Sequence, residues 1–410
     1  MQWRERYRPE QIYIYNSILM SAAFSLVFTI NQIYRVQTVG LNPLQLVLTG
    51  TTLEVTAFLF EIPTGVFADV YSRRLSTILG IVLIGISFII EGLIPIFSVI
   101  LIAQVVWGIG WTFISGAEDA WISDEIGAEK AAPLFLRATS VGLLSNLVAI
   151  PVSVILAQFG LFLPFLVGGS LLLLLAFLLS LLMPENGFQP LMREERKRGS
   201  SLIDTLKQGI DLVRIKPGLL AFMGAAIFVG LYSEGFDRLT EAHFLTNFKF
   251  PSIPMLDVVV WFGLIRAGRI LLSVGTTELA RRRIRLQDNR ALVRALQFSY
   301  GLIAAGILLF AQTGLFWVAL IATWLVHSLR ALAEPLKTAW INQHIDSRLR
   351  ATVLSTASQM DAFGQMIGGP ISGAVGTIRS ISAALTTSAL MLLPALPLYQ
   401  RLKRQTSQDS

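Results

Sequence analysis

The stretch EIPTGVFADVYSRR, residues 61–74, joins two apolar runs at residues 47–68 and 75–95. Each run is long enough to cross a bilayer as a helix, because about 20 apolar residues span the hydrocarbon core. The second half of the stretch carries an acidic residue followed by two adjacent basic residues. Hydrocarbon disfavours such charges. The stretch therefore predicts a tight turn at a membrane face, with a transmembrane helix on each side.

The residues of this turn form a recognisable pattern. Gly65 has no side chain to hold a neighbouring helix away, and Asp69 places a carboxylate where the apolar run ends. The pattern resembles the signature loop between helices two and three of the major facilitator superfamily, in which a Gly, an Ala-Asp pair and two basic residues recur at this spacing. The matching residues are Gly65, Ala68, Asp69, Arg73 and Arg74.

Two positions depart from the family pattern, since Val70 and Ser72 replace the usual basic residue and Gly. Just upstream, Glu61, Pro63 and Thr64 resemble the drug:proton antiporter branch that includes tetracycline and macrolide exporters. The resemblance also implies that Asp124 pairs with the basic residues of the loop. We accordingly expect Asp69, Arg73 and Asp124 to form a charge cluster.

Composition places the chain among membrane proteins. Of its 410 residues 54% are hydrophobic and only 14% are charged, with a mean hydropathy of +0.64. The net charge of +7 does not indicate a nucleic-acid partner, because Lys and Arg punctuate apolar runs instead of covering one face. The chain has no Cys, and its three His lack metal-ligand spacing. We expect no enzyme activity, metal or cofactor.

About twelve apolar runs have spanning length. They occupy residues 11–34, 47–68, 75–95, 98–122, 134–158, 161–183, 218–240, 254–277, 291–312, 315–337, 351–377 and 381–402. The long polar interval after the sixth run predicts an N-terminal six-helix bundle at 1–183, a linker at 184–217 and a C-terminal bundle at 218–410. Within the linker, apolar residues between Leu202 and Val213 recur at helical spacing, which indicates either an amphipathic surface helix or a solvated linker.

Two sequence elements recur in the two halves. The tetrapeptide AWIS at 120–123 is echoed by AWIN at 339–342, and LRAT at 136–139 is repeated at 349–352. The order of the elements and their positions at span ends also match. The repeat predicts an all-α membrane protein of twelve transmembrane helices in two pseudo-symmetric six-helix bundles, the major facilitator fold.

Several ionisable residues lie inside the predicted spans, where each costs on the order of 3 kcal/mol or more without a partner or a water-filled cavity. We assign Glu61, Glu118 and Asp119, with Arg137, to a structural network near the inner ends of the spans, and Glu91 to the outer interface. The first half offers its acids hardly any basic residue at comparable depth. The remaining groups are proton-coupling candidates, Glu54, Glu334 and Asp361, and substrate-cavity candidates, Asn31, Arg266, Arg269, His327 and Arg330.

Alternatives remain open for these groups. Glu54 is the leading proton site, but it could instead bond to Asn31 or Gln32. Asp361 could pair with Arg266 or Arg269 and merely neutralise it. The leading function is proton-coupled, alternating-access efflux of amphipathic drugs or metabolites by a monomer in the cell (inner) membrane, as in multidrug efflux and antibiotic resistance. The rivals are a carrier of anionic or lipid-like solutes and a non-transporting scaffold or sensor.

Lys and Arg placement predicts that both termini and the linker are cytoplasmic, because basic residues favour that side. Single-Cys labelling in intact cells tests this directly, since the chain has no Cys of its own. We predict that Arg198→Cys is protected from an impermeant thiol reagent and that Lys249→Cys is labelled. The reverse result would invert the orientation.

Overall fold

The structure is a computed structural model that describes residues 8–190, 217–254, 256–283, 289–345 and 347–405. The predicted amphipathic segment within 202–213 lies outside these residues. The described residues form helices α1 Pro9–Phe28, α2 Asn31–Ile33, η1 Tyr34–Thr38, α3 Pro43–Val70, α4 Arg73–Leu93, α5 Phe97–Ile114, α6 Ala117–Ile126, α7 Ala128–Phe159, α8 Leu163–Leu182, α11 Pro217–Asn247, α12 Val258–Arg283, α13 Asn289–Gln312, α14 Phe316–His344, α15 Ser347–Ile378, α16 Ile381–Leu392 and α17 Ala395–Gln405.

Within the described residues, eleven spans are long and apolar enough to cross a membrane. Large apolar side chains on their surfaces are exposed, as at Phe159 (79%) and Leu136 (73%), which suits contact with lipid and not with water. The expected run at 351–377 is not among these eleven; it lies within α15, which has 32 residues but is rich in Gly, Ser, Thr and Gln. The chain is therefore a multi-pass, helical membrane protein.

The fourth expected run is not one continuous helix. It divides into α5 and α6 at Ser115 and Gly116, and Gly116 has a φ of 76°. Only glycine adopts this left-handed conformation without steric cost. The expected run at 98–122 lies within one candidate span, Phe97–Ile126, whose helical backbone is interrupted at the Ser-Gly pair before Glu118.

The helices separate into two compact units. The first contains the described residues of Met1–Gly40, Thr52–Ser201 and Val258–Gly263, and the second those of Leu41–Thr51, Leu202–Asp257 and Leu264–Ser410. Helices α3 and α12, which occupy the second place in each half of the sequence, each contribute residues to both units.

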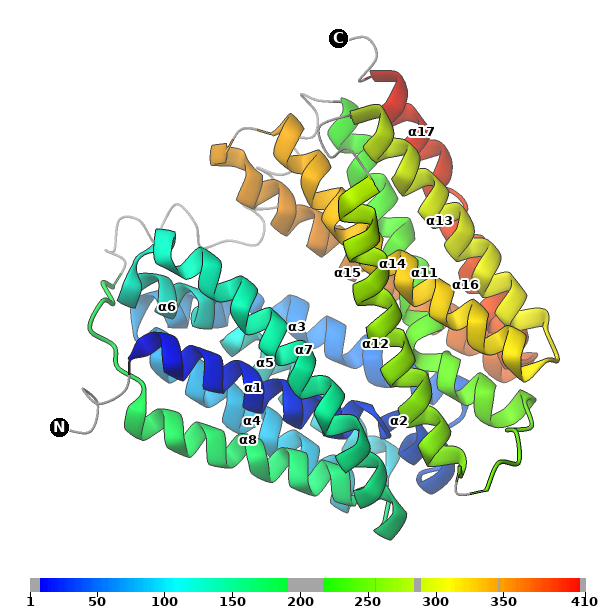
Figure 1. Cartoon of the computed structure of the whole chain (residues 1–410), viewed down its shortest axis with the longest axis horizontal. Helices are drawn as coiled ribbons and strands as arrows, with labels where there is room; N and C mark the ends of the chain where they lie inside the picture. Colours follow the sequence, from blue (N-terminus) through cyan, green and yellow to red (C-terminus); the bar gives the residue numbers. More distant parts are fainter. Residues whose placement is uncertain (1–7, 191–216, 255, 284–288, 346, 406–410) are drawn as a thin grey trace. The chain divides into compact units, whose positions relative to one another are not determined.

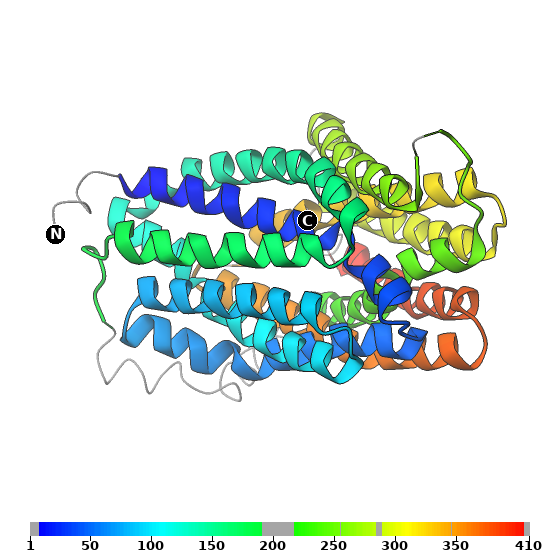
Figure 2. The ribbon, with the colours of Figure 1, turned by 90° about the horizontal axis from the view of Figure 1, so that it is seen from below.

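Helix packing within the second unit repeats helix packing within the first. In the first unit α1 packs on α7 and α8, and α4 packs on α5 and α8 (Figures 1 and 2). In the second, α11 packs on α15 and α16, and α13 packs on α14 and α16. These pairs join equivalent runs of each half. The repeated sequence elements thus accompany a repeated pattern of helix contacts.

The contact between α11 and α15 is the most extensive in the chain and depends on glycine. A Cβ on Gly368 would lie 2.6 Å from the Cα of Leu231, and one on Gly364 would lie 2.8 Å from the Leu231 nitrogen. A Cβ on Gly230 would overlap the Asp361 carbonyl oxygen. Small residues allow the two backbones to touch, which membrane helices use in place of hydrophobic association.

We predict that Gly368→Ala lowers the free energy of unfolding by about 1–3 kcal/mol, because the added methyl group has no space. The control is Gly301→Ala in α13, where a Cβ would meet nothing within 4 Å. That change should be neutral or should stabilise by up to about 1 kcal/mol, as expected for a helix interior. Thermal unfolding in detergent measures both. Equal stability of the two variants would contradict the packing argument.

Candidate functional site

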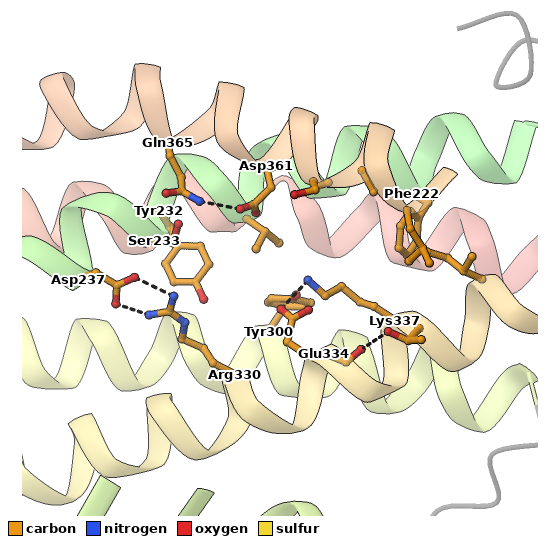
Figure 3. A pocket seen from close by; sticks show the side chains of 17 residues that line it. Phe222, Tyr232, Ser233, Asp237, Tyr300, Arg330, Glu334, Lys337, Asp361 and Gln365 are labelled. Carbon is orange, nitrogen blue, oxygen red and sulfur yellow. Dashed lines mark hydrogen bonds and ion pairs between the residues drawn. The ribbon is translucent and has the colours of Figure 1, made fainter. Parts of the chain in front are cut away.

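The second unit contains a cavity of about 330 Å³ among helices α11, α13, α14 and α15 (Figure 3). Its polar lining residues include Asp237, Arg330, Glu334, Lys337, Asp361 and Gln365. Charged groups are rare within membrane spans and normally face a protein interior or a cavity. This cavity is therefore the candidate substrate site.

Helical periodicity explains how these residues meet. On α14 the lining residues Arg330, Glu334, Lys337 and Ile341 recur every three or four positions, so they share one face. Leu354, Ala357, Ser358, Asp361 and Gln365 do the same on α15. The polar faces of two long helices thus line one space.

The charges in the cavity are unequal in number. Arg330 pairs with Asp237 through two hydrogen bonds, one of which joins Nη2 to Oδ2 at 2.8 Å. Lys337 Nζ lies 2.7 Å from Glu334 Oε1. Asp361 Oδ2 accepts a hydrogen bond of 2.7 Å from Gln365 Nε2. Three carboxylates thus face two cations in the lining, and Asp361 is the one whose direct partner is a neutral amide.

Aromatic and apolar side chains complete the lining. The Arg330 guanidinium lies 5.8 Å from the centre of the Tyr232 ring, and Tyr300 stacks on Tyr399 at 5.2 Å. Figure 3 shows the Asp237–Arg330 pair toward one end of the cavity and Phe222 toward the other. The cavity therefore offers both a charged and an apolar environment to one ligand.

A second polar cluster joins α11, α12 and α14. Arg269 Nη1 lies 3.3 Å from His327 Nε2, and since Arg can only donate, the imidazole nitrogen is the acceptor. The Glu241 carboxylate interacts electrostatically with Arg266 and Arg269. Of the predicted cavity residues, only Arg330 lines the cavity described above. Arg266, Arg269 and His327 belong to this second cluster.

Asp361 accepts a hydrogen bond from Gln365 on its own helix, whereas Arg269 donates to His327. The acids of α11 were missed. The sequence did contain a signal for them: three acids, Glu234, Asp237 and Glu241, are spaced three and four positions apart within and just after an apolar run. This spacing places them on one face of a helix. Glu234 is buried and pairs with Arg238 at 2.8 Å.

In the first unit the structure brings three signature-loop residues together. Arg73 Nη1 lies 2.6 Å from Asp124 Oδ2, and Arg73 Nη2 lies 3.7 Å from Asp69 Oδ1. Arg74 bonds instead to the Ser180 carbonyl. A Cβ on Gly65 would meet nothing within 4 Å, so the expected close approach of a helix there is not observed among the described residues.

The residues that follow α8 are fastened to this loop. Glu185 accepts hydrogen bonds from Ser72 Oγ at 2.7 Å and from the Arg74 backbone nitrogen at 2.9 Å. Trp121 Nε1 donates to the Pro184 carbonyl at 2.6 Å. Glu125 accepts from the backbone nitrogens of 186 and 187 at 2.6 and 2.8 Å. The beginning of the predicted linker is thus anchored to α4 and α6.

A buried ion pair in the first unit corrects another expectation. Glu91 does not lie at an exposed interface: it pairs with Arg35 at 2.7 Å, and the side chain of Arg35 is 1% exposed. Gln104 Nε2 donates to the same carboxylate at 2.8 Å. Arg35 lies in η1, which continues the helical backbone after α2, and its side chain is buried.

Glu54 is half-buried on α3. The Asn31 side-chain oxygen accepts from the Gln32 backbone nitrogen at 2.8 Å. The Asn31 side chain is thus engaged by the neighbouring residue in the chain. Glu54 is also not among the residues that line the cavity of the second unit.

The family model described as Major Facilitator Superfamily matches residues 14–329, which is most of the chain. The chain belongs to this superfamily of transporters. It is 21% identical over 356 residues to YxaM of Bacillus subtilis (strain 168), an uncharacterized MFS-type transporter, covering 87% of this chain and 86% of that protein.

Solved transporter structures share the fold of this member. The nucleoside transporter NupG superposes with a TM-score of 0.71 at 12% identity, covering 97% of this chain and 98% of NupG. A bacterial homolog of the human lysosomal transporter Spinster, inward-facing and unoccupied, gives 0.74 at 14% identity, covering 98% and 97%. At such identities the likeness concerns fold alone.

We predict that Asp69→Asn lowers the transport rate severalfold while the protein remains inserted in the membrane. The change removes one of the two carboxylates beside Arg73 and so alters the balance of charge in the loop. Initial rates in proteoliposomes, normalised to inserted protein, measure the effect. Glu129→Gln, an exposed acid on α7, is the matched control. A wild-type rate for Asp69→Asn would exclude a role for the cluster in transport.

Proposed function

We propose that this superfamily member exports amphipathic solutes, drugs or metabolites, in exchange for protons by alternating access. The observation that carries the proposal is the excess carboxylate at Asp361, which lines the cavity and bonds to Gln365 instead of to a cation. A carboxylate in this setting can bind either a proton or a cationic group of a substrate. Mutually exclusive binding at one site is the basis of antiport.

Gln365 suits this exchange because an amide can serve both forms of the acid. Its Nε2 donates to the ionised carboxylate, as observed, and its carbonyl oxygen can accept from a protonated one. Glu334 is the proposed route for protons, since its side chain is 69% exposed while Lys337 holds it beside the cavity. Arg330 and Asp237 neutralise each other, and their two hydrogen bonds fix the orientation of both side chains.

The substrate class follows from the rest of the lining. Phe222, Val229 and Leu354 provide an apolar surface, and the Tyr232 and Tyr300 rings can contact either an apolar body or a cation. A solute with an amine at one end and an apolar body at the other matches both parts. The proposed organisation is twelve membrane spans in two bundles, 1–183 and 218–410, with linker 184–217, both termini cytoplasmic, in the inner membrane as a monomer.

A carrier of anionic solutes is the second candidate, favoured by Arg266 and Arg269. Both arginines interact electrostatically with Glu241, however, and the cavity cations Arg330 and Lys337 are each paired with an acid. Paired cations attract an anion less than free ones. Uptake into proteoliposomes with and without a pH gradient, using amine and carboxylate solutes, separates these candidates from a non-transporting scaffold.

We predict that Asp361→Asn abolishes transport driven by a pH gradient but retains downhill exchange of substrate. Asn keeps the hydrogen bond to Gln365 and removes the group that binds the proton. Glu54→Gln is the matched comparison, because it makes the same chemical change at the leading alternative proton site on α3. Loss of driven transport in Glu54→Gln alone would assign the exchange to Glu54. If both variants retained transport driven by a pH gradient, Glu334 would be the next candidate for the proton site.

A further inference from the structure

A pair of acids lies in the first unit, where the fourth expected run is broken. Glu118 and Asp119 occupy the first turn of α6, directly after the left-handed Gly116. Each is held by a residue of α1. Asn16 Nδ2 donates to Glu118 Oε1 at 2.6 Å, and the Tyr13 hydroxyl donates to Asp119 Oδ1 at 2.7 Å. The expected contact with Arg137 is replaced by these two neutral partners.

Asn16 is incompletely satisfied. It is 3% exposed, and its Oδ1 has no hydrogen-bond partner among the described residues. A buried carbonyl oxygen without a donor destabilises the fold, because it has lost its hydrogen bonds to water without replacing them. Asn16 Nδ2 already donates to the Glu118 carboxylate. The Oδ1 atom of the same amide therefore lies beside a carboxylate that, when ionised, accepts hydrogen bonds but cannot donate them. The site is therefore one donor short.

The charged groups around Glu118 do not supply that donor. Helix α6 packs on α1, α4, α5 and α7, and α5 contains no charged residue. Arg73 pairs with Asp124 and Asp69, Arg74 bonds to Ser180, and Lys130 and Arg137 are exposed. The other titratable groups on these elements are acids or tyrosines: Glu10, Tyr13, Tyr15, Glu91, Asp119, Asp124, Glu125 and Glu129.

The geometry points to a proton-binding site made by Glu118 and Asn16, distinct from Asp361. A proton on Glu118 Oε2 is the missing donor. The protonated acid gives its O–H to Asn16 Oδ1 while its Oε1 keeps the hydrogen bond from Asn16 Nδ2. An acid and an amide then form a closed pair with two reciprocal hydrogen bonds, and the orphan oxygen is satisfied.

Asp119 favours the same outcome. It is the charged neighbour that interacts electrostatically with Glu118, and two adjacent carboxylates resist simultaneous ionisation. Asp119 already accepts from the Tyr13 hydroxyl, whereas Glu118 faces the amide whose oxygen lacks a donor among the described residues. Proton binding at Glu118 follows from this geometry alone. A role for this proton in the exchange of substrate for protons rests on the proposed function. Each unit would then contain one carboxyl group that binds and releases a proton.

Infrared difference spectroscopy of the full chain in lipid, between alkaline and acidic buffer, tests proton binding without any substrate. We expect the wild type to gain a carbonyl band of a protonated carboxyl that is absent in Glu118→Gln and retained in Asp119→Asn. Asn16→Leu should move that band to higher frequency, because the Glu118 carbonyl loses its donor. The proposal would be overturned if the wild-type spectrum minus that of Glu118→Gln contained no such band, or if Asn16→Leu left the band unmoved.

The wild type alone provides a second measurement should Glu118→Gln fail to fold. Dicyclohexylcarbodiimide is apolar and reacts with protonated carboxyls, and peptide mass spectrometry locates its adduct. We expect the adduct on Glu118 in acidic buffer and its loss in alkaline buffer, and an unmodified Glu118 in acid would count against the site. Both measurements are independent of transport, so a protein that binds this proton but does not export amines would disprove only the proposed function.

Discussion

A charge inside a membrane protein requires a partner, because hydrocarbon offers no water to solvate it. This constraint orders the polar side chains of both units. Arg35 and Glu91 meet at 2.7 Å in the first unit, and Glu234 and Arg238 meet at 2.8 Å in the second. These pairs neutralise charge and leave their helices free to pack through apolar and small residues.

Two other described carboxylates bond to side-chain amides. Asp361 lines the cavity of the second unit with an amide from Gln365 as its direct partner. Glu118 faces the amide of Asn16 in the first unit. An amide solvates a carboxyl without neutralising it, so it leaves the choice between the ionised and protonated forms open. We regard this replacement of a cation by an amide as the chemical feature that separates candidate proton sites from structural ion pairs.

Close helix packing makes the polar arrangement precise. Gly230, Gly364 and Gly368 bring the backbones of α11 and α15 into contact, which places Asp361 opposite the α11 residues of the cavity. The same contact leaves no room for side chains larger than hydrogen at those positions. The polar composition of α15 is compatible with membrane burial because its small residues face a protein neighbour.

Much of the organisation was open to prediction because it depends on local sequence. The membrane-spanning character, the superfamily and the grouping of Asp69 with Arg73 followed from run lengths and from one short stretch. The interruption of the helix at Gly116 within the span at residues 97–126 could not be predicted from hydropathy, because hydropathy does not report backbone conformation. The acids of α11 were missed because they lie within a run whose average hydropathy is high.

By itself, therefore, the sequence determined that this chain is a helical membrane transporter whose two halves repeat one another. Span length and periodicity depend only on residues that are close together in the sequence. Only the tertiary structure decided which charges neutralise one another. Partners such as Arg330 and Asp237, or Asn16 and Glu118, are about a hundred positions apart in the chain. Their contact depends on the rotation and packing of whole helices, and spacing along the sequence does not specify either.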